Sequence, residues 1–371
     1  MIVAFCLYKY FPFGGLQRDF LRIAHTVAAR GHTVRVYVQS WQGERPPEFD
    51  IIDVPVTSRT NHGRNAEYAR WVTQHLEQHP VDRVVGFNKM PGLDVYYAAD
   101  VCYAEKVARE KGFFYRLTPR YRHFAAFERA VFAQGQPTKL LMLTDQQIAD
   151  FRKHYATEAE RFFILPPGIY PDRKYSHQPP GAREQFRQQN QIDSQQYLLL
   201  QVGSDFSRKG VDRSIEAVAA LPAELRSKVA LYIVGQDKPG RFAQLAKRLG
   251  IGKNVHFFAG RNDVSQLMAA ADLLLHPAYQ EAAGIVLLEA ITAGLPVITS
   301  AVCGYAHYIR DAGCGEVIEQ PWRQEALNAA LINALGNKSL REAWADNARH
   351  YADTQDLYSL PEKAADIIIG E

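Results

Sequence analysis

The sequence has few cysteines, little net charge and no uninterrupted apolar run of membrane-spanning length. Its four cysteines among 371 residues are scattered without metal-ligand spacing, so we expect reduced core residues. The formal net charge of +3 gives no argument for a nucleic-acid partner. The most apolar run, residues 284–302, contains Glu289 and is broken by Gly294 and Pro296. It predicts a helix followed by a buried strand, not a transmembrane segment.

Two common functional motifs are also missing. No G-x-G-x-x-G fingerprint is present, which argues against a dinucleotide-dependent dehydrogenase. No D-x-D sequence occurs, so we expect neither the metal clamp built on that motif nor any other cofactor. The first residues, "MIVAFCLYKYFPFGG", lack a basic leader and a cleavage site and predict a first β-strand, not a signal peptide. Together with the unpaired cysteines, these features favour a cytoplasmic location.

Short β-branched or aromatic runs alternate with helical patterns in both halves, which is typical of parallel sheets wrapped by helices. The first half predicts strands near 1–8, 33–38, 50–54, 83–88, 138–144 and 161–165, and helices near 15–30, 64–79, 118–135 and 145–156. The second half predicts strands near 197–202, 230–234, 255–259, 272–276, 296–300 and 316–319, and helices near 210–221, 240–249, 263–271, 284–293 and 322–335. The alternation of strands and helices in each half therefore predicts a doubly wound α/β sheet.

A proline-rich segment separates the two halves. The stretch "LPPGIYPDRKYSHQPP", residues 165–180, cannot continue a helix or a central strand. We therefore expect a hinge there, between two domains of ordinary size.

The loop after the first strand of each half is the first place to look for a ligand site, because ligands collect at the carboxyl ends of parallel strands. In the first half, Gly14 and Gly15 would let backbone approach a ligand beside a helix N-terminus, or would only open a turn. In the second half, Arg208 and Lys209 stand directly before Gly210 and a helix. Cations at a helix N-terminus are unfavourable, which indicates a compensating anion such as a diphosphate; the alternative is a solvated surface pair.

Two acids eight positions apart follow in "EAAGIVLLEAITAGLPVI". Glu281 falls in the loop after an apolar strand, and Glu289 falls within the next helix among apolar neighbours. Carboxylates accept hydrogen bonds from the vicinal hydroxyls of a sugar or ribose, so the pair could address two ends of one ligand. The alternative for Glu289 is a solvent-facing position, which the apolar sequence around it makes doubtful.

This segment resembles the E-x7-E segment of the retaining glycosyltransferases of family 4. The resemblance extends over the chain through the first glycine loop, the Arg208-Lys209 pair and the proline-rich hinge. It implies the GT-B fold, in which two Rossmann-like α/β domains face a central cleft. The implied domains are residues 1–168 with a returning segment 353–371 on the acceptor and membrane side, and residues 169–352 on the nucleotide-sugar side.

The resemblance also implies roles for residues that match the family's positions. Gly14 and Gly15 would lie along the donor diphosphate, Arg208 and Lys209 would neutralise it, Glu281 would face the transferred glucose, and Glu289 would hold the ribose. The donor loop between the two acids reads Ala282, Ala283, Gly284 and Ile285, where many members read glycine at the position of Ala282. Three further candidates match positions near the cleft: Arg173 for donor binding, and Asp19 and Asp100 for catalysis. Asp100 would occupy the neighbourhood of a histidine that several relatives place near the anomeric carbon.

Within the family, the set "FPFGGLQRDF", "TNHGRNAEY", "VVGFNKMPGLDVYYAADVCYAEKV", "LPPGIYPDRKYS" and "HYADTQDLYSLPEKAADII" is similar to enzymes of lipopolysaccharide core synthesis. It implies an enzyme that moves glucose from UDP-glucose to an inner-core heptose, with retention and without metal, at the cytoplasmic face of the inner membrane. Another retaining UDP-sugar hexosyltransferase of envelope glycan synthesis is the nearest alternative. A sugar-nucleotide epimerase and a non-catalytic membrane scaffold are further alternatives.

Residues 103–132 combine basic and aromatic side chains more densely than the rest of the chain. The segment holds seven Lys or Arg against three Glu, hence about +4, together with eight Phe or Tyr. Cations near an anionic leaflet contribute about 1 kcal/mol each, and aromatic rings suit the interface. We therefore expect peripheral binding to the anionic inner-membrane surface; the alternative is a solvated surface helix whose rings face the core.

Overall fold

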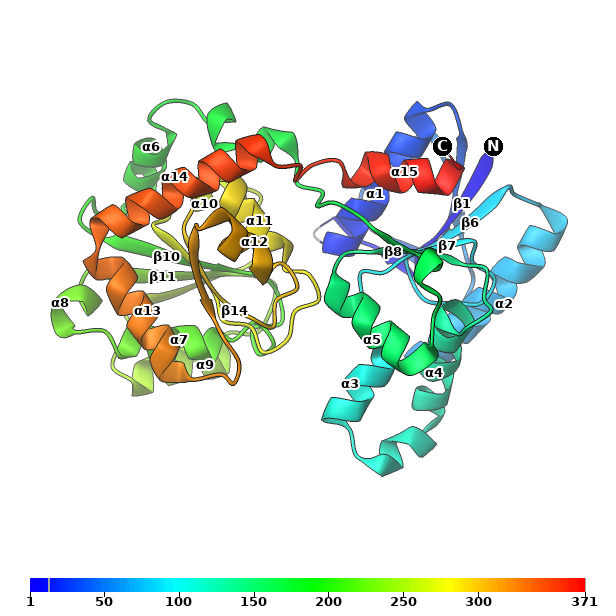
Figure 1. Cartoon of the computed structure of the whole chain (residues 1–371), viewed down its shortest axis with the longest axis horizontal. Helices are drawn as coiled ribbons and strands as arrows, with labels where there is room; N and C mark the ends of the chain where they lie inside the picture. The colour runs from blue at the N-terminus through cyan, green and yellow to red at the C-terminus, as the bar shows by residue number, and fades with distance from the viewer. Residues whose placement is uncertain (13, 371) are drawn as a thin grey trace. The chain divides into compact units, whose positions relative to one another are not determined.

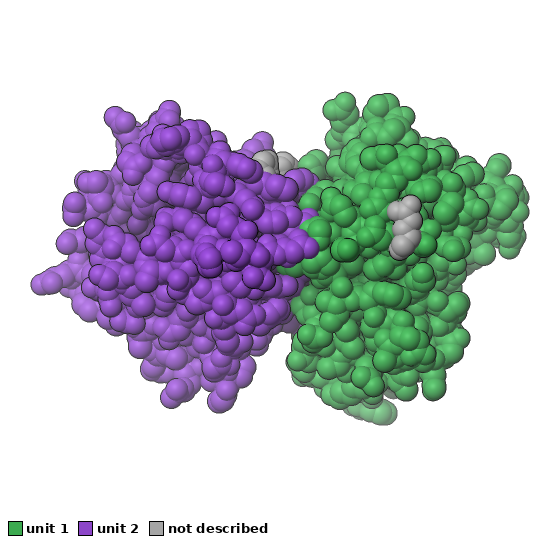
Figure 2. All heavy atoms as spheres, turned by 45° about the horizontal axis from the view of Figure 1, so that its top comes forward, with its two compact units in different colours: residues 1–168, 359–371 green, residues 169–358 purple. Residues whose placement is uncertain are grey.

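The computed structural model describes residues 1–12 and 14–370. The chain divides into two compact units, the first comprising Met1–Gly168 with Ser359–Glu371 and the second comprising Ile169–Tyr358 (Figure 2). The division after Gly168 falls inside the expected hinge. The return to unit 1 follows Tyr358, later than the expected position 353, which lies within the last helix of unit 2 (Lys338–Thr354).

Unit 1 is built on a parallel seven-stranded sheet in the order β5-β3-β1-β6-β7-β8-β9. The strands are β1 (Ile2–Cys6), β3 (Thr33–Val38), β5 (Phe49–Asp53), β6 (Arg83–Gly86), β7 (Val95–Tyr97), β8 (Lys139–Met142) and β9 (Phe162–Ile164), with a small pair formed by β2 (Lys9–Tyr10) and β4 (Ser40–Trp41). The helices are α1 (Gly15–Ala29), α2 (Asn61–Gln78), α3 (Tyr103–Glu110), α4 (Pro119–Phe132), α5 (Asp145–Tyr155) and α15 (Leu360–Ile369), with 3-10 turns η1 (Phe113–Leu117) and η2 (Ala159–Arg161).

Unit 2 holds a parallel six-stranded sheet in the order β12-β11-β10-β13-β14-β15. The strands are β10 (Tyr197–Val202), β11 (Val229–Val234), β12 (Val255–Phe258), β13 (Leu273–His276), β14 (Val297–Ser300) and β15 (Gly315–Ile318). The helices are α6 (Ala182–Gln189), α7 (Val211–Ala219), α8 (Ala223–Arg226), α9 (Gly240–Arg248), α10 (Val264–Ala270), α11 (Ile285–Thr292), α12 (Ala306–Ala312), α13 (Gln324–Gly336) and α14 (Lys338–Thr354), with 3-10 turns η3 (Pro171–Arg173) and η4 (Tyr175–His177).

In each unit, helices cover both faces of the sheet, so the strands are buried on both sides and read as apolar runs. In unit 2, helices α7, α9 and α13 lie against one face, and α10, α11, α12 and α14 lie against the other (Figure 1). In unit 1, α15 packs on α1 although the two helices come from opposite ends of the chain (Figure 1). The prediction of two doubly wound parallel sheets is confirmed.

The apolar core of each unit follows from this layering. Strands β10, β11 and β13 contribute fully buried Leu, Ile and Val side chains that meet the inner faces of α7 and α13. All four cysteines are buried and free of disulfide bonds, as expected of core residues. Within the described residues, none of the helices is both long enough and apolar enough to cross a bilayer.

Candidate active site

Three predicted residues of unit 2 meet at the carboxyl ends of its central strands. The loop after β10 carries Arg208 and Lys209, and the loop after β13 carries Glu281. Glu281 accepts from the Lys209 ammonium and from Arg208 Nη1, the latter at 3.2 Å. The side chains of Lys209 and Glu281 are 11% and 12% exposed, so the pair is largely removed from water. Arg208 is more open, and its guanidinium also contacts Asp205.

Electrostatics explain why the Glu281 carboxylate is ionised although it is buried. Burial alone would raise the pKa of Glu281, but His276, Lys209 and Arg208 outweigh it and hold the pKa far below its ordinary value. His276, at the end of β13, is fully buried with Nε2 3.7 Å from Glu281 Oε2. Burial would lower the pKa of His276, yet Cys303 and Glu281 more than compensate, and the net shift is upward. Within the protein, the Glu281 carboxylate is an anion that pairs with the two cations at this helix N-terminus.

Backbone geometry at two glycines places Lys209 against Glu281. Gly210 has a φ of +69°, and a Cβ there would lie 2.1 Å from the Pro277 carbonyl oxygen. The loops after β10 and β13 can approach this closely only because no side chain stands between them. A Cβ on Gly203, which has a φ of +139°, would meet the Lys209 stem at 3.1 Å, so Lys209 crosses the surface that this glycine leaves open.

Arg213 on α7 fixes the loop after β13, a role that the sequence did not reveal. Its guanidinium donates to the carbonyls of Pro277 and Ala278, each at 3.0 Å. The same group lies over the ring of Tyr279 at 3.5 Å and over that of Trp322 at 3.7 Å. A cation between two aromatic faces fixes the loop that leads to Glu281.

Two other contributors were also missed. Asp205 adopts a φ of +62° and accepts from the Arg208 backbone and guanidinium, each at 3.2 Å. His276 could have been suspected, because an ionisable residue that ends the apolar run "DLLLH" at a ligand-facing edge is unusual. No comparable signal exists for Arg213, since its partner Trp322 is distant in sequence.

The second acid, Glu289, is buried in α11 with a side chain 8% exposed. Arg173 of η3 donates to its Oε1 through Nη1 and supplies the partner that a buried carboxylate needs. The solvent-facing alternative for Glu289 is therefore wrong. Arg173, predicted to bind the donor, is engaged with this acid in the structure.

The donor loop between the two acids turns at Gly284 and not at Ala282. Gly284 has a φ of +92° and caps the N-terminus of α11, whereas Ala282 does not have a positive φ. Alanine at position 282 therefore causes no backbone strain. The loop, which also contains Ala283 and Ile285, is anchored where the Tyr305 amide donates to the Ala283 carbonyl at 2.7 Å.

In unit 1, the predicted glycines stand at the start of α1. Gly14 has an ordinary φ of −85°, so its backbone conformation does not require glycine. Steric space does, because a Cβ there would lie 1.8 Å from Gln17 Oε1. Gln17 is buried and donates to the Lys9 carbonyl at 2.9 Å, which ties the loop to α1. No atom of the described residues lies within 4 Å of a Cβ built on Gly15, so this side of the loop is open.

Two further predicted acids lie in unit 1 but belong to different surroundings. Asp19 on α1 accepts from the Tyr97 hydroxyl at 2.7 Å, at the end of β7. Asp100 is exposed and lines a cavity of about 690 Å³ near α3 and α4. Its backbone carbonyl accepts from Gln147 at 3.3 Å. The catalytic roles of both acids stay predictions.

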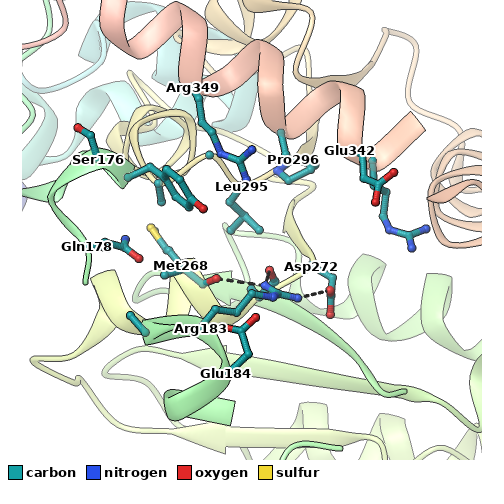
Figure 3. Close-up of a pocket in the computed structure, with 18 of the residues that line it drawn as sticks. Ser176, Gln178, Arg183, Glu184, Met268, Asp272, Leu295, Pro296, Glu342 and Arg349 are labelled. Carbon is teal, nitrogen blue, oxygen red and sulfur yellow. Dashed lines mark hydrogen bonds and ion pairs between the residues drawn. The ribbon is translucent and has the colours of Figure 1, made fainter. Parts of the chain in front are cut away.

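A separate cavity of about 840 Å³ lies at the opposite edge of the unit 2 sheet (Figure 3). Asp272 and Pro296, which line it, precede β13 and β14, so the cavity adjoins the amino ends of these strands. Arg183 crosses its floor to pair with Asp272 at 2.6 Å (Figure 3). This position is remote from the loops that carry Lys209 and Glu281.

No group of three or more His, Cys, Asp or Glu side chains suited to a metal ion is found within residues 1–12 and 14–370. The expectation that no metal or other cofactor is required stays a prediction. The two cations beside Glu281 are the charged groups that these loops offer to a phosphate.

Comparison with known proteins identifies the family. The model described as "Glycosyl transferases group 1" matches residues 182–351, and "Glycosyltransferase Family 4" matches residues 13–173. The lipopolysaccharide glucosyltransferase WaaG of Escherichia coli K12 is 76% identical over 370 residues, which cover 100% of this chain and 99% of that protein. The chain belongs to glycosyltransferase family 4.

Solved structures agree with this family 4 assignment. A crystal structure of WaaG, described as a glycosyltransferase involved in lipopolysaccharide biosynthesis, superposes with a TM-score of 0.96 at 75% identity, covering 100% of both chains. The Anabaena protein Alr3699/HepE in complex with UDP and glucose has a TM-score of 0.77 at 19% identity, also over 100% of both chains. The latter similarity concerns the fold alone. The predicted GT-B fold is confirmed.

The close approach at Gly210 generates a stability prediction with an internal control. Gly210→Ala should destabilise the protein by more than the ~1 kcal/mol of a left-handed alanine, because the new Cβ also meets a fixed backbone carbonyl. Gly250→Ala is the matched control, since Gly250 has a φ of +74° with no atom within 4 Å of the added Cβ. Thermal or urea unfolding measures both. Equal destabilisation of the two variants would contradict the role of the loop contact.

Proposed function

We propose that this enzyme transfers glucose from UDP-glucose to an inner-core heptose of lipopolysaccharide, with retention of configuration and without a metal ion. The observation that carries the proposal is the Arg208-Lys209-Glu281 cluster at the carboxyl ends of β10 and β13. It supplies two cations and one ionised carboxylate where α/β sheets bind ligands. Full-length identity of 76% to the lipopolysaccharide glucosyltransferase of E. coli supports the same substrate class.

The leaving group determines what the cations must do. Departure of UDP places negative charge on the β-phosphate, and preorganised donors at that position lower the barrier. Lys209 offers a compact charge, and Arg208 offers a planar pair of donors that matches two phosphate oxygens. Both are held in place before the donor arrives, so little reorganisation accompanies the reaction.

Glu281 takes a second part in the same step. Its depressed pKa keeps the carboxylate ionised and able to accept hydrogen bonds from sugar hydroxyls. The phosphate shares the Arg208 and Lys209 donors with Glu281. Retention follows when the acceptor hydroxyl attacks from the face that the phosphate leaves, with a phosphate oxygen receiving the proton. Glu289, held by Arg173, would accept from the ribose hydroxyls.

The acceptor is a glycolipid, so we propose that unit 1 acts at the anionic cytoplasmic face of the inner membrane. The turn η1 exposes three large apolar side chains: Phe113 is 72% exposed, Phe114 81% and Leu117 55%. Lys111 and Arg116 flank them and are also exposed. Apolar rings between cations suit the boundary between headgroups and acyl chains.

Product analysis tests the reaction. Mass spectrometry should show one hexose added to lipopolysaccharide truncated at the inner-core heptose when UDP-glucose is the donor. UDP-galactose and UDP-N-acetylglucosamine serve as controls, together with a reaction lacking acceptor. Addition should persist in EDTA, because Arg208 and Lys209 occupy the role of a metal clamp. Epimerised donor without transfer, or loss of activity in EDTA that Mg²⁺ or Mn²⁺ restores, would contradict the proposal.

Replacing the buried cation tests the mechanism. Lys209→Ala should lower kcat by about 10²–10³-fold, the usual effect of losing one preorganised donor to a developing anion. Lys238→Ala is the matched control, since Lys238 is an exposed cation in the loop after β11. Circular dichroism should show that both variants keep their fold. Normal turnover in Lys209→Ala would remove this residue from the mechanism.

Replacing the exposed rings tests membrane contact. Phe113→Ser/Phe114→Ser should weaken co-sedimentation with vesicles containing phosphatidylglycerol by at least about tenfold, because each buried ring contributes roughly 1.5–3 kcal/mol. Ile164→Ser/Leu249→Ser removes two other exposed apolar side chains and should bind as the unaltered protein does. Raising the salt concentration should weaken binding further. Equal loss in the two double variants would contradict a specific role for η1.

A further inference from the structure

Unit 1 contains a cavity of about 690 Å³ that the proposed donor chemistry does not use. It lies beside the carboxyl ends of β1 and β6, with α3 and α4 forming its outer wall. The volume falls in the usual range for ligand sites, about 300–1,000 Å³. Because ligands of α/β sheets collect at this edge, the cavity is placed where unit 1 would bind a substrate.

The side chains that line the cavity are of the kinds that bind sugars. Rings line the cavity from several elements: Tyr8, Tyr103, Tyr115, Phe124 and Phe127. Flat aromatic faces cover the apolar faces of pyranose rings, while polar groups take the hydroxyls. Asn65 and Asn88 supply such groups, and Asn88 is oriented by the Tyr8 amide, which donates to its Oδ1 at 2.7 Å.

Three cations distinguish this cavity from a site for a neutral sugar. Lys106, Lys111 and Arg120 line it, and none of them forms an ion pair within the described residues. Lys111 lies 5.8 Å from the Tyr115 ring centre, and Arg120 lies 5.4 Å from that of Phe124. Asp100 and Glu110 are the acids of the lining. The fourth cation of the lining, Lys89, is neutralised by Glu128.

The outer wall is fixed to the core by that same acid. Glu128 of α4 is fully buried and accepts from the backbone amides of Tyr103 and Ala104 at 2.8 and 2.9 Å. The Tyr155 hydroxyl donates to it at 2.8 Å. Burial would raise the pKa of Glu128, but Lys89 and the two backbone amides lower it overall, so the carboxylate caps α3 in its charged form. The cavity is therefore preformed.

A second, smaller cavity of about 310 Å³ continues the first toward the glycine loop. The two share four lining residues, namely Tyr8, Asn65, Asn88 and Phe124. The smaller one is also lined by Leu16 and Gln17, next to Gly14 and Gly15. A chain of sugars can thus extend from the glycine loop into the cationic cavity.

We propose that the larger cavity binds a carboxylate- or phosphate-bearing sugar of the glycolipid acceptor through Lys106, Lys111 and Arg120, while the reacting sugar lies in the smaller cavity. This proposal rests on the proposed function. The exposed rings of η1 belong to the same segment as the cavity wall, since η1 joins α3 to α4. Contact with the leaflet and capture of the acidic sugar then involve one structural unit.

The test uses a soluble, deacylated inner-core oligosaccharide, which removes the membrane from the measurement. Lys106→Ala/Arg120→Ala should raise the KM for this acceptor at least about tenfold, with kcat within twofold. Arg70→Ala/Arg152→Ala is the matched control, because both arginines are exposed on α2 and α5 and outside the cavity lining. Its KM should be unchanged. Equal changes in the two double variants would overturn the proposal.

Modified acceptors identify the anionic group. A carboxyl-reduced and a dephosphorylated oligosaccharide are compared with the parent compound. The form that lacks the recognised acid should have a raised KM with the unaltered protein and no further rise with Lys106→Ala/Arg120→Ala. If the variant loses as much on acceptors from which both acids are removed, the cations do not bind an acid and the proposal fails.

Direct binding separates this proposal from the proposed function. Calorimetry with the same oligosaccharide, without donor, measures affinity whether or not glucose is transferred. Binding by the unaltered protein that weakens at least about tenfold in Lys106→Ala/Arg120→Ala supports the cavity even if transfer fails. Binding that is absent or equal in both overturns the cavity, and leaves the proposed function standing if transfer proceeds.

Discussion

The site in unit 2 is arranged around the ion pairs that the buried Glu281 carboxylate forms with Arg208 and Lys209. A charge this far from water is costly unless partners surround it, and here they come from separate strands. Lys209 follows β10, His276 ends β13, and Cys303, after β14, forms a backbone bridge with Glu281. The loops are therefore mutually dependent, and a change in one alters the electrostatic balance of the others.

The same arrangement explains why glycines occur where they do. Lys209 reaches the carboxylate because Gly210 lets two loops meet and Gly203 leaves room for the lysine stem. Arg213, whose guanidinium lies between two aromatic rings, fixes the position of the loop after β13. Preorganisation of this kind is achieved through packing and backbone geometry, so it exists before any ligand binds.

The sequence predicts much of the fold because buried parallel strands read as short apolar runs. Each expected strand has an observed counterpart, whereas β7 (Val95–Tyr97) and the two-residue strands β2 and β4 were not predicted. Among the helices that the sequence did not predict are α3, α8, α12, α14 and α15. Helix α3 starts at a cap supplied by Glu128, which lies on another helix, so no local signal marks it.

The candidate site, like the fold, was predicted from the sequence only in part. Residue type and position after a strand predicted Arg208, Lys209 and Glu281 as site residues, and an acid among apolar helix neighbours predicted Glu289. Their pairings could not be predicted, because they depend on contacts between distant segments. The pair Arg173–Glu289 and the contact of Arg213 with Trp322 each join residues about a hundred positions apart. The contact of Glu281 with both cations was not predicted, and the binding of a phosphate by Arg208 and Lys209 stays a prediction.

The return of the chain to unit 1 has a consequence for the order of events during synthesis. Unit 2 is inserted between Gly168 and Ser359, and α15 packs on α1 only after that insertion is complete. Leu360, Ala364 and Ile368, which are buried in α15, are synthesised after the whole of unit 2. Unit 2 can therefore finish folding while the apolar surface of α1 still lacks its cover, and unit 1, although its synthesis starts before that of unit 2, is completed after it.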